Sequence, residues 1–173
     1  MVASPSVENY YIGKGICSFK PTAGSWRDLG NVTEVSFTPN QETLDHYSSR
    51  GGIREKDLTV ALENAGECLF TMEEYSLENL GMAVMGDVQT APSGYSYIDI
   101  FSTTQITGEF KFTGTNDVGP KLQLHLLRVD IFPSNELQLI SEEFASIQIT
   151  AQVAAVDGNW GTLIDLNTVS GSL

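Results

Sequence analysis

The sequence predicts a mainly β protein, an antiparallel β-sandwich or barrel with one short α-helix on its flank. Most hydrophobic residues lie in short runs that alternate with polar residues, which is the period of a half-buried strand. Clusters of Gly, Pro, Asn and Asp separate these runs at close spacing. A single segment, residues 76–86, shows helical spacing instead. Many short strands with such turns are typical of a sandwich or a barrel.

The first strands flank a polar stretch. Residues 10–19 are aromatic and β-branched but contain two glycines, which predicts a bulged or edge strand. Residues 32–38 alternate, and we expect this strand to stop at Pro39-Asn40, a breaker and turn pair. In the next strand, residues 58–63, one face is apolar, and a bend or bulge is expected at residues 64–66. The side chains of the apolar face are those of Leu58, Val60 and Leu62.

The helical segment carries recognisable ends. Ser76 is a suitable N-cap, Glu78 lies in the first turn, and Gly86 is a plausible glycine just past the end. Gly81 costs roughly 1 kcal/mol relative to alanine in a helix, so we expect close packing at that position. The predicted apolar stripe, which must lie on the sheet, consists of Leu77, Leu80, Val84 and Met85.

The C-terminal half returns to the β pattern after a connector rich in Gly, Pro, Ser and Thr at residues 87–96. Within the longest strand the alternation changes frame at Leu126-Leu127, which predicts a bulge. The predicted strands cover residues 97–104, 108–113, 121–132, 138–140, 144–156 and 163–166.

Length and composition fit one soluble domain over residues 1–173, with flexible ends at about 1–8 and 167–173. The net charge is −13 and is spread along the chain, so it belongs to the folded surface and argues against affinity for nucleic acid. Cys17 and Cys68 are the only cysteines, and we expect them to be reduced and partly buried. The N-terminus lacks the features of a secretory signal, and no apolar run reaches the ~20 residues of a membrane helix.

The most informative stretch is a long polar loop predicted at about residues 40–57. Three of the nine basic residues, Arg50, Arg54 and Lys56, lie in it, although the rest of the protein is acidic. Such a loop favours a docking element whose cations find carboxylates on a neighbouring copy. A mobile hairpin tip is the alternative interpretation.

A search for chemistry finds no catalytic, metal or cofactor motif in the sequence. Asp45, His46 and Ser48 are adjacent in the predicted loop, where the geometry of a catalytic triad is rarely held. The two histidines and two distant cysteines have no zinc spacing, and Gly13-Lys14-Gly15 is not a phosphate-binding loop. The sequence therefore predicts no enzyme and no cofactor, and favours a role in assembly.

The chain resembles a known family, the major tail tube proteins of long-tailed, non-contractile (siphovirus-type) bacteriophages. The similarity runs in order from about Tyr10 to Leu166, and the ordered set of segments is more specific than any one of them. The segments are Trp26–Val32, Glu42–Val60, Leu69–Glu74, Glu78–Gly86, Leu126–Ile140 and Phe144–Val153.

The resemblance implies a β-sandwich subunit that assembles into hexameric rings, which stack into a hollow tail tube in the virion after assembly in the host cytoplasm. Its implied partners are other copies of itself, a tape measure protein, a tail tip or baseplate initiator and a tail terminator, with DNA passing through the lumen. The residues that the resemblance places at an inter-subunit or inter-ring contact are Asp45, His46, Tyr47, Ser48, Ser49, Arg50, Ile53, Arg54 and Lys56.

A pore that conducts a polyanion should not bind it, so carboxylates are suited to its wall. We therefore expect the lumen to be lined by acidic residues on strand faces, unless these residues serve solubility on an outer surface. The candidates are Glu34, Glu63, Asp99, Glu109 and Asp130.

Two other functions remain open from the sequence. The first is the tube protein of a contractile injection or secretion system, which would share the fold and the ring. The second, from a different class, is a carbohydrate- or ligand-binding β-sandwich module, in which exposed aromatic residues would form a stacking platform. The aromatic candidates for that platform are Trp26, Tyr95, Tyr97 and Trp160.

Overall fold

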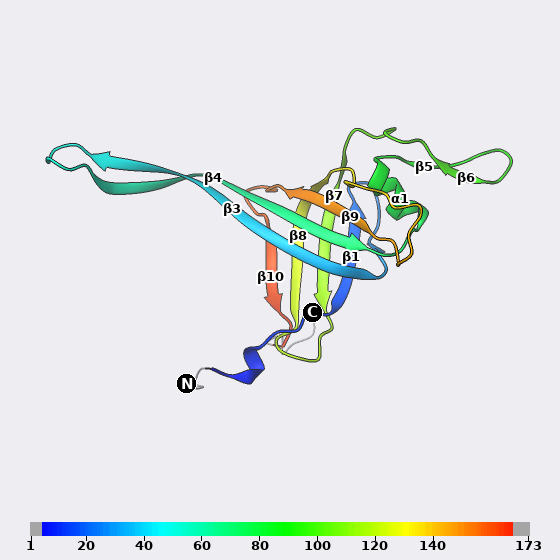
Figure 1. Cartoon of the computed structure of the whole chain (residues 1–173), viewed down its shortest axis with the longest axis horizontal. Helices are drawn as coiled ribbons and strands as arrows, with labels where there is room; N and C mark the ends of the chain where they lie inside the picture. Colours follow the sequence, from blue (N-terminus) through cyan, green and yellow to red (C-terminus); the bar gives the residue numbers. More distant parts are fainter. Residues whose placement is uncertain (1–4, 168–173) are drawn as a thin grey trace.

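The computed structural model describes residues 5–167, and these form two layers of antiparallel strands that pack face to face (Figure 1). The strands are β1 (Gly15–Pro21), β2 (Arg27–Asp28), β3 (Val32–Ser48), β4 (Glu55–Met72), β5 (Val88–Thr90), β6 (Ser96–Ile98), β7 (Ile106–Gly114), β8 (Leu122–Ile131), β9 (Ile147–Val153) and β10 (Gly161–Asp165). The helix α1 spans Leu77–Val84, and a 3-10 turn spans Val7–Asn9. The predicted fold class, mainly β with one short α-helix, is confirmed for the described residues.

The main sheet has the strand order β2-β1-β7-β8-β9-β4-β3, with β10 also paired to β8. The strand β8 connects the two layers, because its residues 122–126 pair with β10 while its residues 129–131 pair with β9. In Figure 1 the strands β3, β4 and β9 cross in front of β10, β8, β7 and β1. The predicted bulge in β8 is confirmed, since the register with β7 shifts between Gly108 and Phe110.

The core lies between these layers. Phe70 of β4 stacks on Phe110 of β7, with ring centroids 5.1 Å apart, and both side chains are fully buried. Each large side chain removed from water in this way stabilises the fold by about 1.5–3 kcal/mol. Cys17 and Cys68 are unpaired, as predicted, but they are fully rather than partly buried. Burial raises the pKa of each thiol to about 12.

The helix α1 starts as predicted but ends and packs differently. The Ser76 hydroxyl accepts a hydrogen bond from the Asn79 backbone N–H at 3.2 Å. The left-handed residue that ends the helix is Met85 (φ 54°) rather than Gly86. The predicted stripe is confirmed in part: Met85 is buried and Leu80 and Val84 pack against the core, but Leu77 is exposed. The buried face also carries Asn79, Met82 and Ala83, which were not predicted.

Asn79 is tolerated in the core because its amide is fully used. Its Nδ2 donates to the backbone oxygens of Leu29 at 3.1 Å and Glu74 at 2.9 Å, and its Oδ1 accepts from Arg27 Nη1 at 2.7 Å. A buried amide with these partners avoids the cost of an unsatisfied polar group. The spacing of hydrophobic residues did not predict that Asn79 is buried, because its contacts with the core are polar.

Several predicted strand limits are wrong. The strand β3 continues through Pro39 and Asn40, which is possible because β3 is an edge strand with no partner on its outer side in the described sheet. Residues 64–66 pair with β3 without a shift in register. The irregularities fall instead at Val32/Glu34, Glu42/Thr43 and His46/Tyr47 of β3, and at the last two β4 carries one extra residue. Residues 10–14 and 138–140 form no strand, and the strand expected at 97–104 is limited to β6, which pairs with β5.

Ten of the fifteen residues in the predicted flexible ends lie outside the described residues. Of residues 1–8 the structure describes only 5–8, where the 3-10 turn begins, and of 167–173 it describes only Asn167.

Candidate assembly interface

The strands β3 and β4 extend beyond the body as a two-stranded hairpin, residues 40–65, which we call the arm (Figure 1). The strand β4 pairs with β9 only over Gly66–Met72, so the arm has no third strand among the described residues. With 11 residues of β4 at about 3.3 Å each, the arm is on the order of 35 Å long. The predicted loop at 40–57 is therefore wrong as secondary structure: only residues 49–54 form a turn.

The arm has one apolar face that no described residue covers. Leu44 lies directly opposite Val60, and Leu58 lies opposite His46. Leu44, Leu58, Val60 and Leu62 are all exposed, at 59%, 55%, 44% and 57%. The alternation predicted for residues 58–62 is present, but the strand is exposed on both faces rather than half-buried. An isolated two-stranded hairpin is marginally stable in water, so such a face calls for a partner.

The opposite face of the arm is held by polar contacts between the strands. Asp45 accepts hydrogen bonds from the Thr59 hydroxyl at 2.8 Å and from Lys56 Nζ at 3.2 Å. These hydrogen bonds, the one from Thr59 foremost, hold the pKa of Asp45 below its usual value. These contacts stiffen the polar face without any partner. On the apolar side of the arm, where His46 lies opposite Leu58, His46 Nδ1 lies 2.6 Å from an oxygen of Asp57.

The turn at the tip presents cations and one apolar side chain. Ile53 is 84% exposed, the Arg54 guanidinium lies 5.7 Å from the centre of the Tyr47 ring, and Arg50 has no carboxylate within ion-pair distance among the described residues. All nine residues predicted for the inter-subunit contact lie at this outer end. They are Asp45, His46, Tyr47 and Ser48 of β3, Ser49, Arg50, Ile53 and Arg54 of the turn, and Lys56 of β4.

The five predicted lumen residues are not brought together as one acidic surface. Glu109 and Asp130 share the outward face of β7 and β8, since Asp130 pairs with Thr107, two residues from Glu109. Glu34 lies on β3, and Asp99 follows β6. Glu63 lies in the arm directly opposite Glu42.

Glu109 is the centre of a cluster that the sequence search missed. Lys20 Nζ lies 2.6 Å from Glu109 Oε1, and His125 Nε2 lies 2.8 Å from Oε2. The hydrogen bond from Lys20 and, secondarily, that from His125 hold the pKa of Glu109 below its usual value. The Trp26 ring stacks edge-on to His125 at 5.7 Å, with Lys111 Nζ 4.4 Å from its centre. These contacts join residues far apart in sequence, and no local pattern predicts them.

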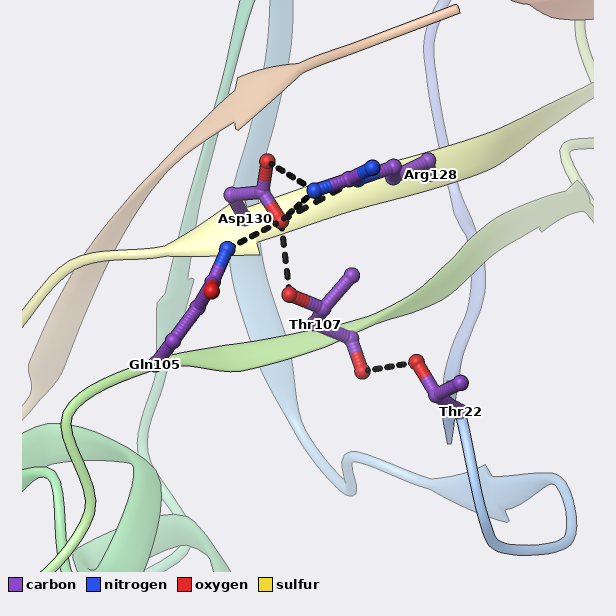
Figure 2. A network of polar contacts seen from close by, with 5 residues as sticks. All are labelled: Thr22, Gln105, Thr107, Arg128 and Asp130. Atoms are coloured by element: carbon purple, nitrogen blue, oxygen red, sulfur yellow. Dashed lines mark hydrogen bonds and ion pairs between the residues drawn. The ribbon is translucent and has the colours of Figure 1, made fainter. Parts of the chain in front are cut away.

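The carboxylate of Asp130 also has several hydrogen-bond partners (Figure 2). It accepts from the Thr107 hydroxyl at 2.6 Å and from Gln105 Nε2 at 3.2 Å, and Arg128 Nη2 lies 3.3 Å from it. Burial alone would raise the pKa of Asp130, but the hydrogen bonds from Thr107 and Arg128 outweigh burial and lower it. The Thr107 carbonyl in turn accepts from the Thr22 hydroxyl at 2.9 Å, which ties the segment after β1 to this network.

The aromatic platform of a sugar-binding module is not assembled by the ring contacts of the described residues. Of the four candidates, only Tyr95 and Tyr97 contact each other, with centroids 6.1 Å apart. Trp26 contacts His125, and Trp160 is partly buried against the core.

Residues 5–167 hold no group of three His, Cys, Asp or Glu side chains that is placed to bind a metal ion. His46 contacts Asp57 rather than the neighbouring serine and aspartate of the hypothetical triad. The described part of the chain has no helix with the length and apolar character needed to cross a bilayer.

The fold and the arm thus define a mainly β protein with an uncovered hairpin. Residues 10–96 match the family described as "Protein of unknown function UCP028589", and the chain belongs to that family. No curated protein is similar enough in sequence to count as a relative.

The solved structures that resemble this one include the following two. A chain of the anti-feeding prophage (AFP) baseplate, determined with 6-fold symmetry, has 11% sequence identity and a TM-score of 0.51, over 95% of this chain and 99% of that one. A chain from the tail of an empty GTA particle, refined with C6 symmetry, has 14% identity and a TM-score of 0.49, over 87% of this chain and 94% of that one. The likeness to the AFP chain shows a shared fold.

Proposed function

We propose that this protein is a structural subunit of a phage-tail-like tube of the siphovirus type, in which hexameric rings stack into a hollow conduit for the genome. The arm is the observation that carries the proposal. It exposes four apolar side chains on one face and a cationic tip, and no described part of the same chain covers them. A monomeric protein rarely keeps such a face, whereas a subunit of an assembly uses it for docking.

Two further observations support an assembly of like copies. The outer edge of β3 is unpaired in the described sheet along its 17 residues, which offers a template for pairing with a strand of another copy. The shared fold with a chain of the 6-fold symmetric AFP baseplate makes a six-membered ring the natural expectation. In the virion, the proposed neighbours are the tape measure protein, the tip or baseplate initiator and the terminator.

Within this proposal the five acidic residues remain the candidates for the lumen, but with two kinds of charge. Glu109 and Asp130 would present carboxylates already paired with the cations Lys20 and Arg128. The others, Glu34, Glu63 and Asp99, have no ion pair among the described residues. Both kinds of surface avoid the counterion release by which cations bind DNA.

Electron microscopy of the concentrated, purified protein tests the proposal directly. Hollow rods or rings of uniform width support it. Dispersed particles that stay single even after a tail-tip initiator is added count against it.

The tip cations give a sharper test. Arg50→Glu or Arg54→Glu should block tube formation while the monomer stays folded, because both side chains are exposed and stabilise nothing in the core. Electron microscopy would measure assembly, and circular dichroism would measure folding. Lys121→Glu is the matched control, because it makes the same charge change at an exposed site away from the arm. Normal tubes with the arginine variants, or unfolded variant protein, would contradict the docking role.

A further inference from the structure

A second uncovered apolar surface lies on the body of the molecule. Residues 139–144, which we call the acceptor loop, expose Leu139 at 80%, Ile140 at 96% and Phe144 at 93%. Large apolar side chains that are this exposed and this close in sequence mark an interaction site more often than ordinary surface. The sequence analysis predicted strands at both ends of this segment, and so missed it.

The acceptor loop is anchored at both ends, so its apolar side chains are held outward. The Tyr75 hydroxyl lies 3.0 Å from the Gln138 carbonyl oxygen and 3.5 Å from that of Ser146. Just before the loop, the Ser134 N–H donates to the carbonyl of Ala83 in α1 at 2.9 Å. A loop tied in this way has already lost much of the conformational freedom that binding would otherwise remove.

The charges of the acceptor loop are opposite to those of the arm. Glu142 and Glu143 have no ion pair among the described residues, and with Glu73 and Phe144 they line a hollow of about 640 Å³. The arm tip carries Arg50 and Arg54, likewise without a carboxylate partner there. Each surface therefore combines exposed apolar side chains with uncompensated charge, and the two signs are complementary.

The arm cannot dock on the acceptor loop of its own chain. The arm extends to one end of the longest axis, whereas the loop that joins β8 to β9 lies beside α1 towards the other end (Figure 1). Contact between two such surfaces is head to tail, and it can repeat from copy to copy until a ring closes or a filament grows.

We propose that the arm of one copy docks on the acceptor loop of a second copy. Ile53 and the apolar face of the arm pack on Leu139, Ile140 and Phe144, and the tip arginines pair with Glu142 and Glu143. The proposal rests on the proposed function for the identity of the partner, a second copy of this chain, and it adds the surface that receives the arm.

Cross-linking between two proteins that each carry one added cysteine tests the contact. Ile53→Cys protein is mixed with Ile140→Cys protein and treated with a short thiol-to-thiol cross-linker, and covalent dimers are measured on a denaturing gel. The native thiols, Cys17 and Cys68, are buried with a pKa raised to about 12, so they give little background. The matched control replaces Ile140→Cys by Leu163→Cys, which is exposed on β10. Equal rates for the two mixtures would overturn the proposal.

Charge exchange separates a specific contact from general stickiness. The double reversal Arg50→Glu with Arg54→Glu in the first protein, or Glu142→Arg with Glu143→Arg in the second, should each slow cross-linking at least about tenfold. Mixing the two reversed proteins should restore the rate, because the signs are again opposite. Failure of this restoration would also overturn the proposed pairing.

The test of the arm–loop contact and the test of tube formation can fail separately. Tubes that form normally with Glu142→Arg and Glu143→Arg would refute the acceptor loop and leave the proposed function standing. Cross-linked chains that never form hollow rods would support the contact and refute the tube.

Discussion

At the scale of single residues, the folded subunit depends on carboxylates that are held by cations from other strands. Glu109 of β7 is the clearest case, since it forms an ion pair with Lys20 of β1 and also contacts His125 of β8. Because Lys20 and His125 lower its pKa in the folded state, the stabilisation is present above the unfolded pKa and is lost as the pH falls through the folded pKa.

We therefore expect Glu109→Gln to destabilise the protein near neutral pH, where Glu109 is ionised and its ion pair with Lys20 is formed. The difference in free energy of unfolding between wild type and variant should shrink as the pH falls below the ordinary carboxyl value of 4.5. Urea denaturation at a series of pH values measures it. Glu34→Gln is the control, an exposed glutamate without an ion pair in the described structure. A penalty at Glu109 that does not vary with pH would contradict this account.

At the scale of secondary-structure elements, the sequence near α1 predicted where the helix begins but not where it ends. The start of α1 was predictable because the cap is a contact between Ser76 and its near neighbour Asn79. The end was not, because a Cβ at Gly86 would collide with the backbone oxygen of Asp99 after β6. Gly86 is thus required by packing against a distant segment, and Met85 takes the left-handed conformation instead.

Gly81 shows the same competition inside the helix. Alanine is the better helix former by roughly 1 kcal/mol, which alone would stabilise α1. A Cβ at this position would, however, lie 2.7 Å from the backbone oxygen of Gly86. We expect Gly81→Ala to destabilise the protein in thermal or urea denaturation, with Glu78→Ala, on the exposed side, as the control. A gain in stability for Gly81→Ala would show that the helix end can move aside.

The arm was the element least accessible to sequence reasoning. Its strands are polar on one face and carry Pro39 near the base, so a local pattern favours a loop. Two strands that pair only with each other leave no core contacts to generate a strong hydrophobic signal. The residues for the candidate interface could still be predicted, because uncompensated cations in an acidic chain are visible in the sequence. The acceptor loop could not, since its exposure follows from anchors at Tyr75 and Ala83 that are remote in sequence.

At the scale of the whole molecule, the body and the arm should be separable. The buried residues of the core belong to β1, β7, β8, β9, α1, the segment after β2 and the inner part of β4, and none belongs to residues 40–65. We expect a chain in which residues 41–64 are replaced by an Asn-Gly turn to fold with a closely similar melting temperature and to remain monomeric. Differential scanning calorimetry and analytical ultracentrifugation would measure the two properties. A body that unfolds without the arm would mean that the hairpin contributes to the fold itself.

The position of the arm and the acceptor loop towards opposite ends of one axis also gives any polymer a direction. A stack joined through these surfaces has one terminus that shows free arms and another that shows free loops. Elongation can then be started by a factor that presents one of the two surfaces, and stopped by a factor that covers the other. The two ends of such a stack therefore present different surfaces, and we expect a protein that binds one end not to bind the other.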